Sequence, residues 1–172
     1  MVWHVSEEAG IAEFVPRPTP TPRPGIDVPI VWAVDDARLH TFLVPRDCPR
    51  VTYYALPTST AADIARLLGT ARAVVAIEQG WWERMCTTRL YLYRLPHASF
   101  WQIDDGSGHW VSAETQTPLE TRIVGDLPAA IAARGVELRV LEDLWALSDA
   151  VVASTLHFSN MRMRNARTCS VR

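Results

Sequence analysis

Five side chains of this sequence have the types and positions that ligand binding or acid–base chemistry requires: His4, Ser6, Arg46, His109 and Glu114. His4 and Ser6 are two residues apart, so a strand ending near Val5 would project both from one face. Ser6 is also a favoured N-cap for a helix over the acidic segment that follows, and the free N–H groups of a helix start attract anions. These residues predict a ligand site at His4 and Ser6. From the local sequence alone, a core histidine beside an ordinary helix cap is the more common arrangement and the alternative.

Cys48 is the candidate nucleophile, because it lies in a turn between Arg46 and Arg50. Two guanidinium groups would lower the pKa of its thiol and favour the reactive thiolate. No base is assigned to it, so an inert cysteine is the alternative. The other cysteines, Cys86 and Cys169, show no close spacing to it or to each other. We therefore expect free thiols and a reducing, cytoplasmic location.

Several functional classes lack support in the sequence. The chain carries no phosphate-loop, dinucleotide-binding or zinc-protease motif, and its five histidines show no metal-ligand spacing, so we expect no metal site. A net charge of −2 argues against a basic nucleic-acid face. No apolar run is long enough to span a membrane. Residues 160–172 are predicted to form an Arg-rich tail, either solvated or contacting phosphate, with the arginines Arg162, Arg164, Arg167 and Arg172.

The elements that would position these residues alternate short strands and short helices. Strands are expected at residues 2–5, 30–34, 50–55, 73–77, 90–95, 100–103, 108–112, 121–124 and 136–141. Helices are expected after Ser6 to about residue 15, from 35 to 43, from 58 to 69, from 126 to 134 and from 144 to about 157. This pattern predicts an α+β fold with a mixed, largely antiparallel sheet and short peripheral helices, as a single domain over residues 1–172.

Residues 16–29 form a proline-rich segment in which every second residue from Pro16 to Pro24 is proline. Proline fixes φ and lacks an N–H donor, so the segment is expected to lie extended on the surface and outside any central strand. The seven tryptophans admit two interpretations. They pack in the core and sheet, or some form an exposed aromatic surface for a protein partner.

Several short motifs resemble those of compact ADP-ribosyltransferase-like domains. His4-Val5-Ser6, the following Phe14-Val15-Pro16-Arg17 and then Val31-Trp32-Ala33 are similar to the first strand, loop and second strand of those domains. The later hairpin of those domains is similar to residues 90–96 and to residues 108–112 followed by Pro118. The resemblance covers residues 2–34 and 88–125. It implies an ADP-ribosyltransferase-like fold and the cofactor NAD.

The resemblance also implies roles for single residues. His4 and Ser6 would hold the dinucleotide. His109 falls where the family has its catalytic glutamate, and no hydroxyl residue stands near residues 32–34 where the family has one. A histidine cannot supply the negative charge that stabilises an oxocarbenium-like transition state. Glu114 is the nearest carboxylate, but its spacing from His109 puts it on the opposite strand face.

The chain is also similar to an uncharacterised bacterial family that shares residues 45–52 and 161–166. Together these observations predict a domain that binds a nucleotide or another phosphorylated ligand in a cleft with His4, Ser6, Arg46 and His109. Whether it is an enzyme is left open; His109 or Glu114 would act as acid or base if it is. The alternative is a non-catalytic protein-interaction domain on the same fold.

Overall fold

The computed structural model describes residues 1–19 and 25–168. The chain divides into two compact units, each built from two separate segments. Unit 1 comprises Met1–Phe42 and Arg89–Val124, and unit 2 comprises Leu43–Thr88 and Gly125–Arg172. The single domain expected over residues 1–172 stays a prediction.

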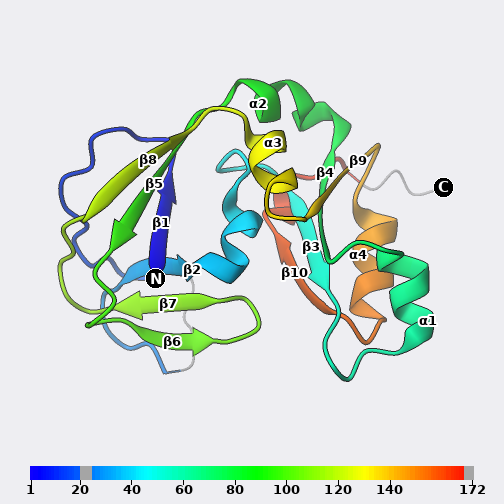
Figure 1. Cartoon of the computed structure of the whole chain (residues 1–172), viewed down its shortest axis with the longest axis horizontal. Coiled ribbons are helices and arrows are strands. Elements are labelled where there is room, and N and C mark those ends of the chain that lie inside the picture. Colours follow the sequence, from blue (N-terminus) through cyan, green and yellow to red (C-terminus); the bar gives the residue numbers. More distant parts are fainter. Residues whose placement is uncertain (20–24, 169–172) are drawn as a thin grey trace. The chain divides into compact units, whose positions relative to one another are not determined.

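Unit 1 is built on a six-stranded sheet with the order β6-β7-β2-β1-β5-β8, in which every pair is antiparallel (Figure 1). The strands are β1 (Val2–Ser6), β2 (Val31–Asp35), β5 (Leu90–Leu95), β6 (Trp101–Asp104), β7 (His109–Ser112) and β8 (Glu120–Val124). The hairpin of β6 and β7 around the expected turn is confirmed, with a register shift near Gln102. A 3-10 helix, η1 (Asp36–Phe42), follows β2 where a helix was expected.

One face of this sheet carries a cluster of buried apolar side chains. The buried members are Val2, Phe14, Val31, Ala33, Tyr93, Leu95 and Phe100. Phe14 comes from the segment after β1. Its backbone N–H donates to the carbonyl of Gln116 at 2.8 Å, and its carbonyl accepts the N–H of Gln116 at 3.0 Å. This segment therefore covers the face that includes Val2 and Tyr93.

The helix predicted after Ser6 is wrong, because residues 7–13, all of them described, form no helix. Tyr93 explains the difference. Its hydroxyl donates to the carbonyl oxygen of Glu8 at 2.7 Å and accepts the N–H of Ile11 at 3.1 Å. Gly10 between them has φ +69°, a left-handed conformation that breaks a helix. These contacts between residues far apart in the sequence outweigh the local helix signals.

Only part of the proline-rich segment lies within the described residues. Arg17 forms an isolated bridge with Ile30, and Pro18 is exposed. Within residues 16–19 the chain joins no named strand, in agreement with the prediction. Pro20, Pro22 and Pro24 lie outside the described residues.

Unit 2 is built on a four-stranded mixed sheet with the order β10-β3-β4-β9, in which β4 and β9 are parallel (Figure 1). The strands are β3 (Arg50–Tyr54), β4 (Ala73–Glu78), β9 (Glu137–Leu141) and β10 (His157–Met161). All six residues of β4 are buried, as expected for a central apolar strand. The helical segments of unit 2 are α1 (Ala61–Asp63), η2 (Ile64–Leu68), η3 (Gln79–Trp81), α2 (Trp82–Thr87), α3 (Leu127–Ala132), α4 (Trp145–Val152) and η4 (Met163–Asn165).

Local capping signals in unit 2 are confirmed. The Thr60 side chain accepts the N–H of Asp63 at 3.2 Å, and Asp126 accepts that of Ala129 at 2.9 Å. Gly69 ends η2 with φ 62°, as its glycine predicted. Arg139 on β9 also satisfies this helix end, donating to the carbonyl of Leu67 at 2.6 Å.

The helix expected from residue 144 to about 157 is too long by more than one turn. It ends at Val152, and the chain then forms the unpredicted edge strand β10. Beyond β10, the Arg167 guanidinium donates to Glu142 at 2.9 Å and its backbone N–H donates to Glu78 at 3.0 Å. Arg172 lies outside the described residues.

The observed architecture is α+β, with one antiparallel and one mixed sheet and short helices. The sequence suggested strands on one sheet, whereas the chain builds two. Within the described ranges, no helix is both long and apolar enough to span a membrane.

Candidate functional site

The centre of the unit 1 sheet splits between β1 and β2. These strands pair only at Val2–Asp35 and Trp3–Val34, whereas β1 stays paired with β5 along its whole length to Ser6. β2 stays paired with β7 over four positions. Beyond Trp3 the two halves of the sheet therefore diverge.

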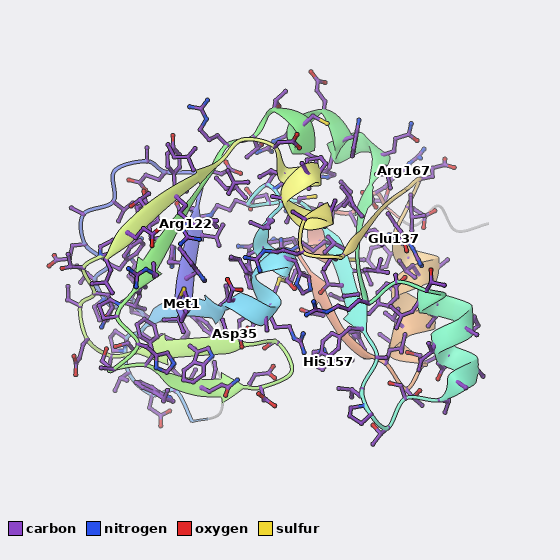
Figure 2. All side chains as sticks on the ribbon, in the orientation of Figure 1. Met1, Asp35, Arg122, Glu137, His157 and Arg167 are labelled. Atoms are coloured by element: carbon purple, nitrogen blue, oxygen red, sulfur yellow. The ribbon has the colours of Figure 1, made fainter. Side chains whose placement is uncertain are left out.

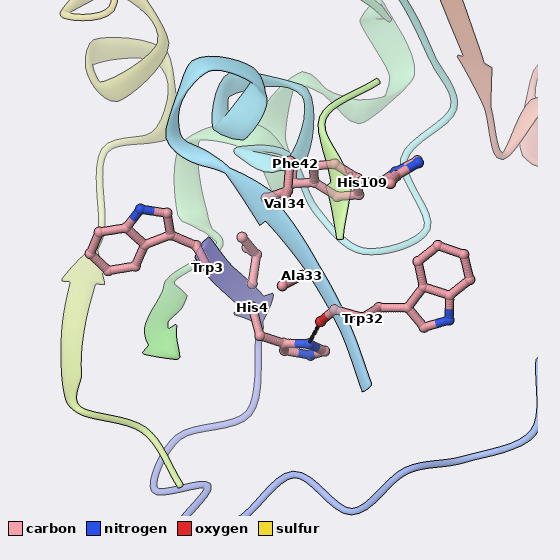
Figure 3. A pocket seen from close by; sticks show the side chains of 8 residues that line it. Trp3, His4, Trp32, Ala33, Val34, Phe42 and His109 are labelled. Carbon is pink, nitrogen blue, oxygen red and sulfur yellow. Dashed lines mark hydrogen bonds between the residues drawn. The ribbon is translucent and has the colours of Figure 1, made fainter. Parts of the chain in front are cut away.

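His4 lies at the point of divergence and replaces a missing ladder bond. Its Nδ1 lies 2.8 Å from the carbonyl oxygen of Trp32, the dashed line in Figure 3. A carbonyl oxygen only accepts, so Nδ1 carries the proton and Nε2 of the neutral ring is an acceptor. The His4 ring also packs on Phe14, with 4.5 Å between ring centroids. His4 thus has a structural role in closing the split, whatever else it binds.

A cavity of about 150 Å³ lies at this split. Its lining comes from β1, β2, η1 and β7 and consists of Trp3, His4, Val5, Trp32, Ala33, Val34, Phe42 and His109 (Figure 3). Trp3, Ala33 and Val34 are buried, whereas the other lining residues are half-buried, so solvent reaches the cavity. None of these described lining residues carries a carboxylate.

The strand register distributes the lining over both faces of the sheet. Trp3 pairs with Val34, and Val34 pairs with His109, so these three side chains form one row on one face. His4 pairs with Tyr93 and projects from the other face, the one covered by Phe14. His4 and His109 thus reach the same cavity from opposite faces, through the gap between the strands.

His109 is held by aromatic edges and by a hydroxyl. Its ring makes edge contacts with Trp32 at 5.6 Å and Phe42 at 5.7 Å between centroids. Its Nδ1 lies 2.7 Å from the Ser107 hydroxyl. The neighbouring Gly108 has φ +65°, and its carbonyl accepts the N–H of Asp35 at 2.9 Å. The tight packing of this hairpin on β2 and η1 fixes the position of His109.

The other predicted site residues lie elsewhere. Ser6 accepts the N–H of Glu8 at 3.0 Å in a turn, so the anion site predicted at a helix start has no helix to form it. Glu114 is exposed beyond β7 and does not line the cavity. Arg46 lies in an exposed turn of unit 2, and its role in binding stays a prediction.

The aromatic wall of the cavity was missed by sequence reasoning. Trp3, Trp32 and Phe42 supply most of it, yet their apolar strand and helix contexts indicated only core packing. The available signal was Trp32, which alternates with Val31 and Ala33 in a strand where both faces are used. Apolar side chains on both faces of one strand indicate that both faces of the sheet contact an apolar surface.

Cys48 is not an activated nucleophile. It is fully buried, and burial raises the pKa of its thiol to about 12, while Arg50 opposes that shift only in part. The Arg50 guanidinium donates instead to the Cys48 carbonyl at 3.1 Å and contacts Met161 Sδ at 3.0 Å. Asn165 donates to the Asp47 carbonyl at 2.8 Å. Residues 45–52 and 161–166 therefore meet in unit 2, where these contacts are structural.

Cys48 and Cys86 are both free thiols, and Cys169 lies outside the described residues. In the part of the chain that is described, no group of three or more His, Cys, Asp or Glu residues has the geometry of a metal site.

Of the comparisons with known proteins, one finds a match, to a family model. Neither the curated proteins nor the solved structures include a significant match to this chain. A family model matches residues 3–166, nearly the whole chain and both units. The chain belongs to the family of unknown function DUF6886.

Proposed function

We propose that unit 1 binds a single heteroaromatic ring, of the nicotinamide or nucleobase kind, in the cavity between β1 and β2. The observation that carries this proposal is the lining, in which three aromatic residues and two histidines contribute to the wall of a cavity of about 150 Å³. Apolar cavities of about this volume hold one benzene-sized ring. Aromatic walls favour flat ligands through stacked and edge-to-face contacts.

The two imidazoles suit a ring with a polar edge. Nδ1 of His4 is committed to the Trp32 carbonyl, which leaves Nε2 as an acceptor in the neutral ring. Nδ1 of His109 also has a partner, the Ser107 hydroxyl at 2.7 Å, which can either donate or accept. Small-molecule sites typically combine an apolar wall with a few fixed polar groups of this kind.

The resemblance to ADP-ribosyltransferase-like domains agrees with this proposal in one respect and differs in another. It implies that His4 contacts NAD, and His4 lies on the cavity wall. It also implies a glutamate that stabilises positive charge, and none of the described lining residues is acidic. We therefore propose binding of the ring without glycosyl transfer, and His109 and Glu114 have no catalytic role in it.

The test is a thermal-shift and tryptophan-fluorescence titration with nicotinamide, NAD, uracil and ribose 5-phosphate. A ligand that binds only the folded state raises the melting temperature. We expect at least one ring compound to raise it and to change the fluorescence of Trp3 and Trp32, and ribose 5-phosphate to do neither. A response to ribose 5-phosphate alone, or none to any ring compound at millimolar concentration, would contradict the proposal.

A cavity-filling variant makes the test specific. Val5→Trp puts a large ring on the cavity wall, so ring binding should be lost. Val28→Trp is the matched control, because Val28 is 49% exposed in the same unit and does not line the cavity. The control should bind as the wild-type protein does.

The alternative of a protein-interaction domain has less support. Among the described residues, the most exposed tryptophans are Trp82 at 42% and Trp101 at 40%. Trp82 belongs to unit 2 and Trp101 to unit 1, so neither unit by itself presents a cluster of exposed tryptophans.

A further inference from the structure

Strand β8 is an edge of the unit 1 sheet and is unusually apolar for an edge. It pairs with β5 along one side and ends the strand order on the other. Ile123 on this strand is 62% exposed, and Leu119 just before it is 58% exposed. An exposed edge strand with apolar side chains is a template for pairing with another strand.

The opposite face of β8 carries two charges of opposite sign. Glu120 accepts from Arg94 at 2.9 Å and from Arg122 at 2.5 Å. The Arg122 guanidinium, labelled in Figure 2, points from this strand. It lies over the ring of Trp3, 4.9 Å from the ring centroid, which fixes its direction. Leu119 and Ile123 thus share one face with Thr121, whereas Glu120 and Arg122 share the other.

We propose that a second copy of this chain pairs with β8 in antiparallel register about a two-fold axis at Thr121. In this register Glu120 lies opposite the partner's Arg122, and Arg122 lies opposite the partner's Glu120. Leu119 lies opposite the partner's Ile123 on the other face. Opposite charges and apolar pairs directly across two strands stabilise the pairing, and a two-fold axis repeats each contact. The six-stranded sheet becomes a continuous sheet of two copies.

Neighbouring registers are unfavourable. An axis at Arg122 places two arginines opposite each other, and an axis at Glu120 does the same with two glutamates. Like charges directly across two strands destabilise the pair. The charge pattern of β8 therefore favours the axis at Thr121 over these two registers.

The edge strand β9 of unit 2 has the same Glu-x-Arg pattern but is a poorer candidate. Its Arg139 already donates to the Tyr53 hydroxyl and the Leu67 carbonyl, both at 2.6 Å. That arginine caps a helix of its own unit. β9 therefore supplies a matched control for β8. The dimer contact at β8 does not depend on ring binding.

The experiment is sedimentation velocity over a range of protein concentrations. The wild-type chain should show a monomer–dimer equilibrium, because a ladder of five residue pairs is short. Arg122→Glu and Glu120→Arg should each be monomeric, since each puts like charges opposite each other. An equimolar mixture of the two variants should recover the dimer, because the pairs across the axis are again of opposite sign.

Two further variants test whether loss of the dimer is due to misfolding and whether the dimer contact lies at β8. Ile123→Lys changes a side chain that is 62% exposed, so it should fold normally and still abolish the dimer. Glu137→Arg on β9 should leave the dimer unchanged. A wild-type chain that stays monomeric at every concentration, or a mixture of folded variants that does not associate, would overturn the proposal, as would a dimer that Ile123→Lys does not affect.

Discussion

At the scale of single residues, the candidate site depends on the glycine before His109 as much as on its aromatic wall. Gly108 immediately precedes His109 and lies against Asp35 and Arg38. The left-handed φ of Gly108 is one that side chains other than glycine rarely adopt. A Cβ on Gly108 would stand 2.7 Å from Asp35 Oδ1 and 2.7 Å from Arg38 Cγ. Backbone conformation and space both require glycine there.

Gly108→Ala should lower the free energy of unfolding by about 2–3 kcal/mol, of which roughly 1 kcal/mol is the cost of the positive φ and the rest is crowding. Gly10→Ala is the control, since Gly10 has φ +69° and no atom within 4 Å of its Cβ position. It should lose only about 1 kcal/mol. Urea denaturation measures both, and equal losses would show that the close approach at Gly108 has no energetic weight.

Burial of Cys48 should make stability depend on alkaline pH. Its pKa rises from 9.0 to about 12 on folding, so the thiol ionises more readily in the unfolded chain. A raised folded pKa stabilises the protein below pH 9, and that stabilisation is lost as pH rises toward 12. Between pH 8 and 10 we expect a loss of about 1.4 kcal/mol, roughly one pKa unit's worth of free energy.

The control for this prediction uses the other described cysteine. Cys48→Ala should remove that part of the pH dependence, and Cys86→Ala should retain it, since Cys86 is exposed. Denaturation at both pH values measures the difference. An unchanged slope in Cys48→Ala would assign the alkaline loss to other groups.

At the scale of elements, the split between β1 and β2 is the feature that creates the cavity. The paired part of β1 and β2 is short, and beyond it the His4 side chain donates a hydrogen bond to the Trp32 carbonyl. A partly buried acceptor that loses its donor destabilises the fold by about 1–3 kcal/mol. The split is therefore a stabilised arrangement and not a frayed end.

His4→Ala should lower the free energy of unfolding by about 1–2 kcal/mol, because the Trp32 carbonyl loses its donor. His4→Asn should recover part of this loss, since the amide N–H₂ stands close to the position of Nδ1. Chemical denaturation of the three proteins gives the comparison. If the alanine and asparagine variants are equally stable, the hydrogen bond contributes nothing and His4 acts through its ring alone.

Elements with local signals were predicted well, and those set by distant contacts were not. The caps at Thr60 and Asp126 lie within the residues that they bond, so the sequence displays them. The segment after Ser6 has similar local signals, but Tyr93 holds it in a non-helical path from 82 and 85 positions away. Strand β10 was missed because its polar residues show no clean alternation. It becomes a strand by pairing with β3.

At the scale of the whole molecule, the fold class followed from the alternation of short strands and helices, but the division into two units did not. Each unit combines one early and one late segment of the chain. No long linker marks the crossings near residues 42, 88 and 124, because at most seven residues, 43–49, separate the flanking elements there. The sequence alone does not show that His4 and His109 share a cavity, because that depends on the pairing of β1, β2 and β7 across the chain. Only the resemblance of residues 2–34 and 88–125 to ADP-ribosyltransferase-like domains connected the two histidines.

This interleaving has a consequence for the order in which the protein is made. Strand β1 pairs with β5, so Trp3 must wait for Arg94 to leave the ribosome before its half of the sheet can form. The β3–β4 pair lies wholly within residues 50–78 and is complete earlier in translation. Contacts between residues distant in the sequence form slowly. The nascent chain should therefore assemble part of unit 2 first and carry the apolar first strand of unit 1 unprotected meanwhile, the stage at which a chaperone would bind it.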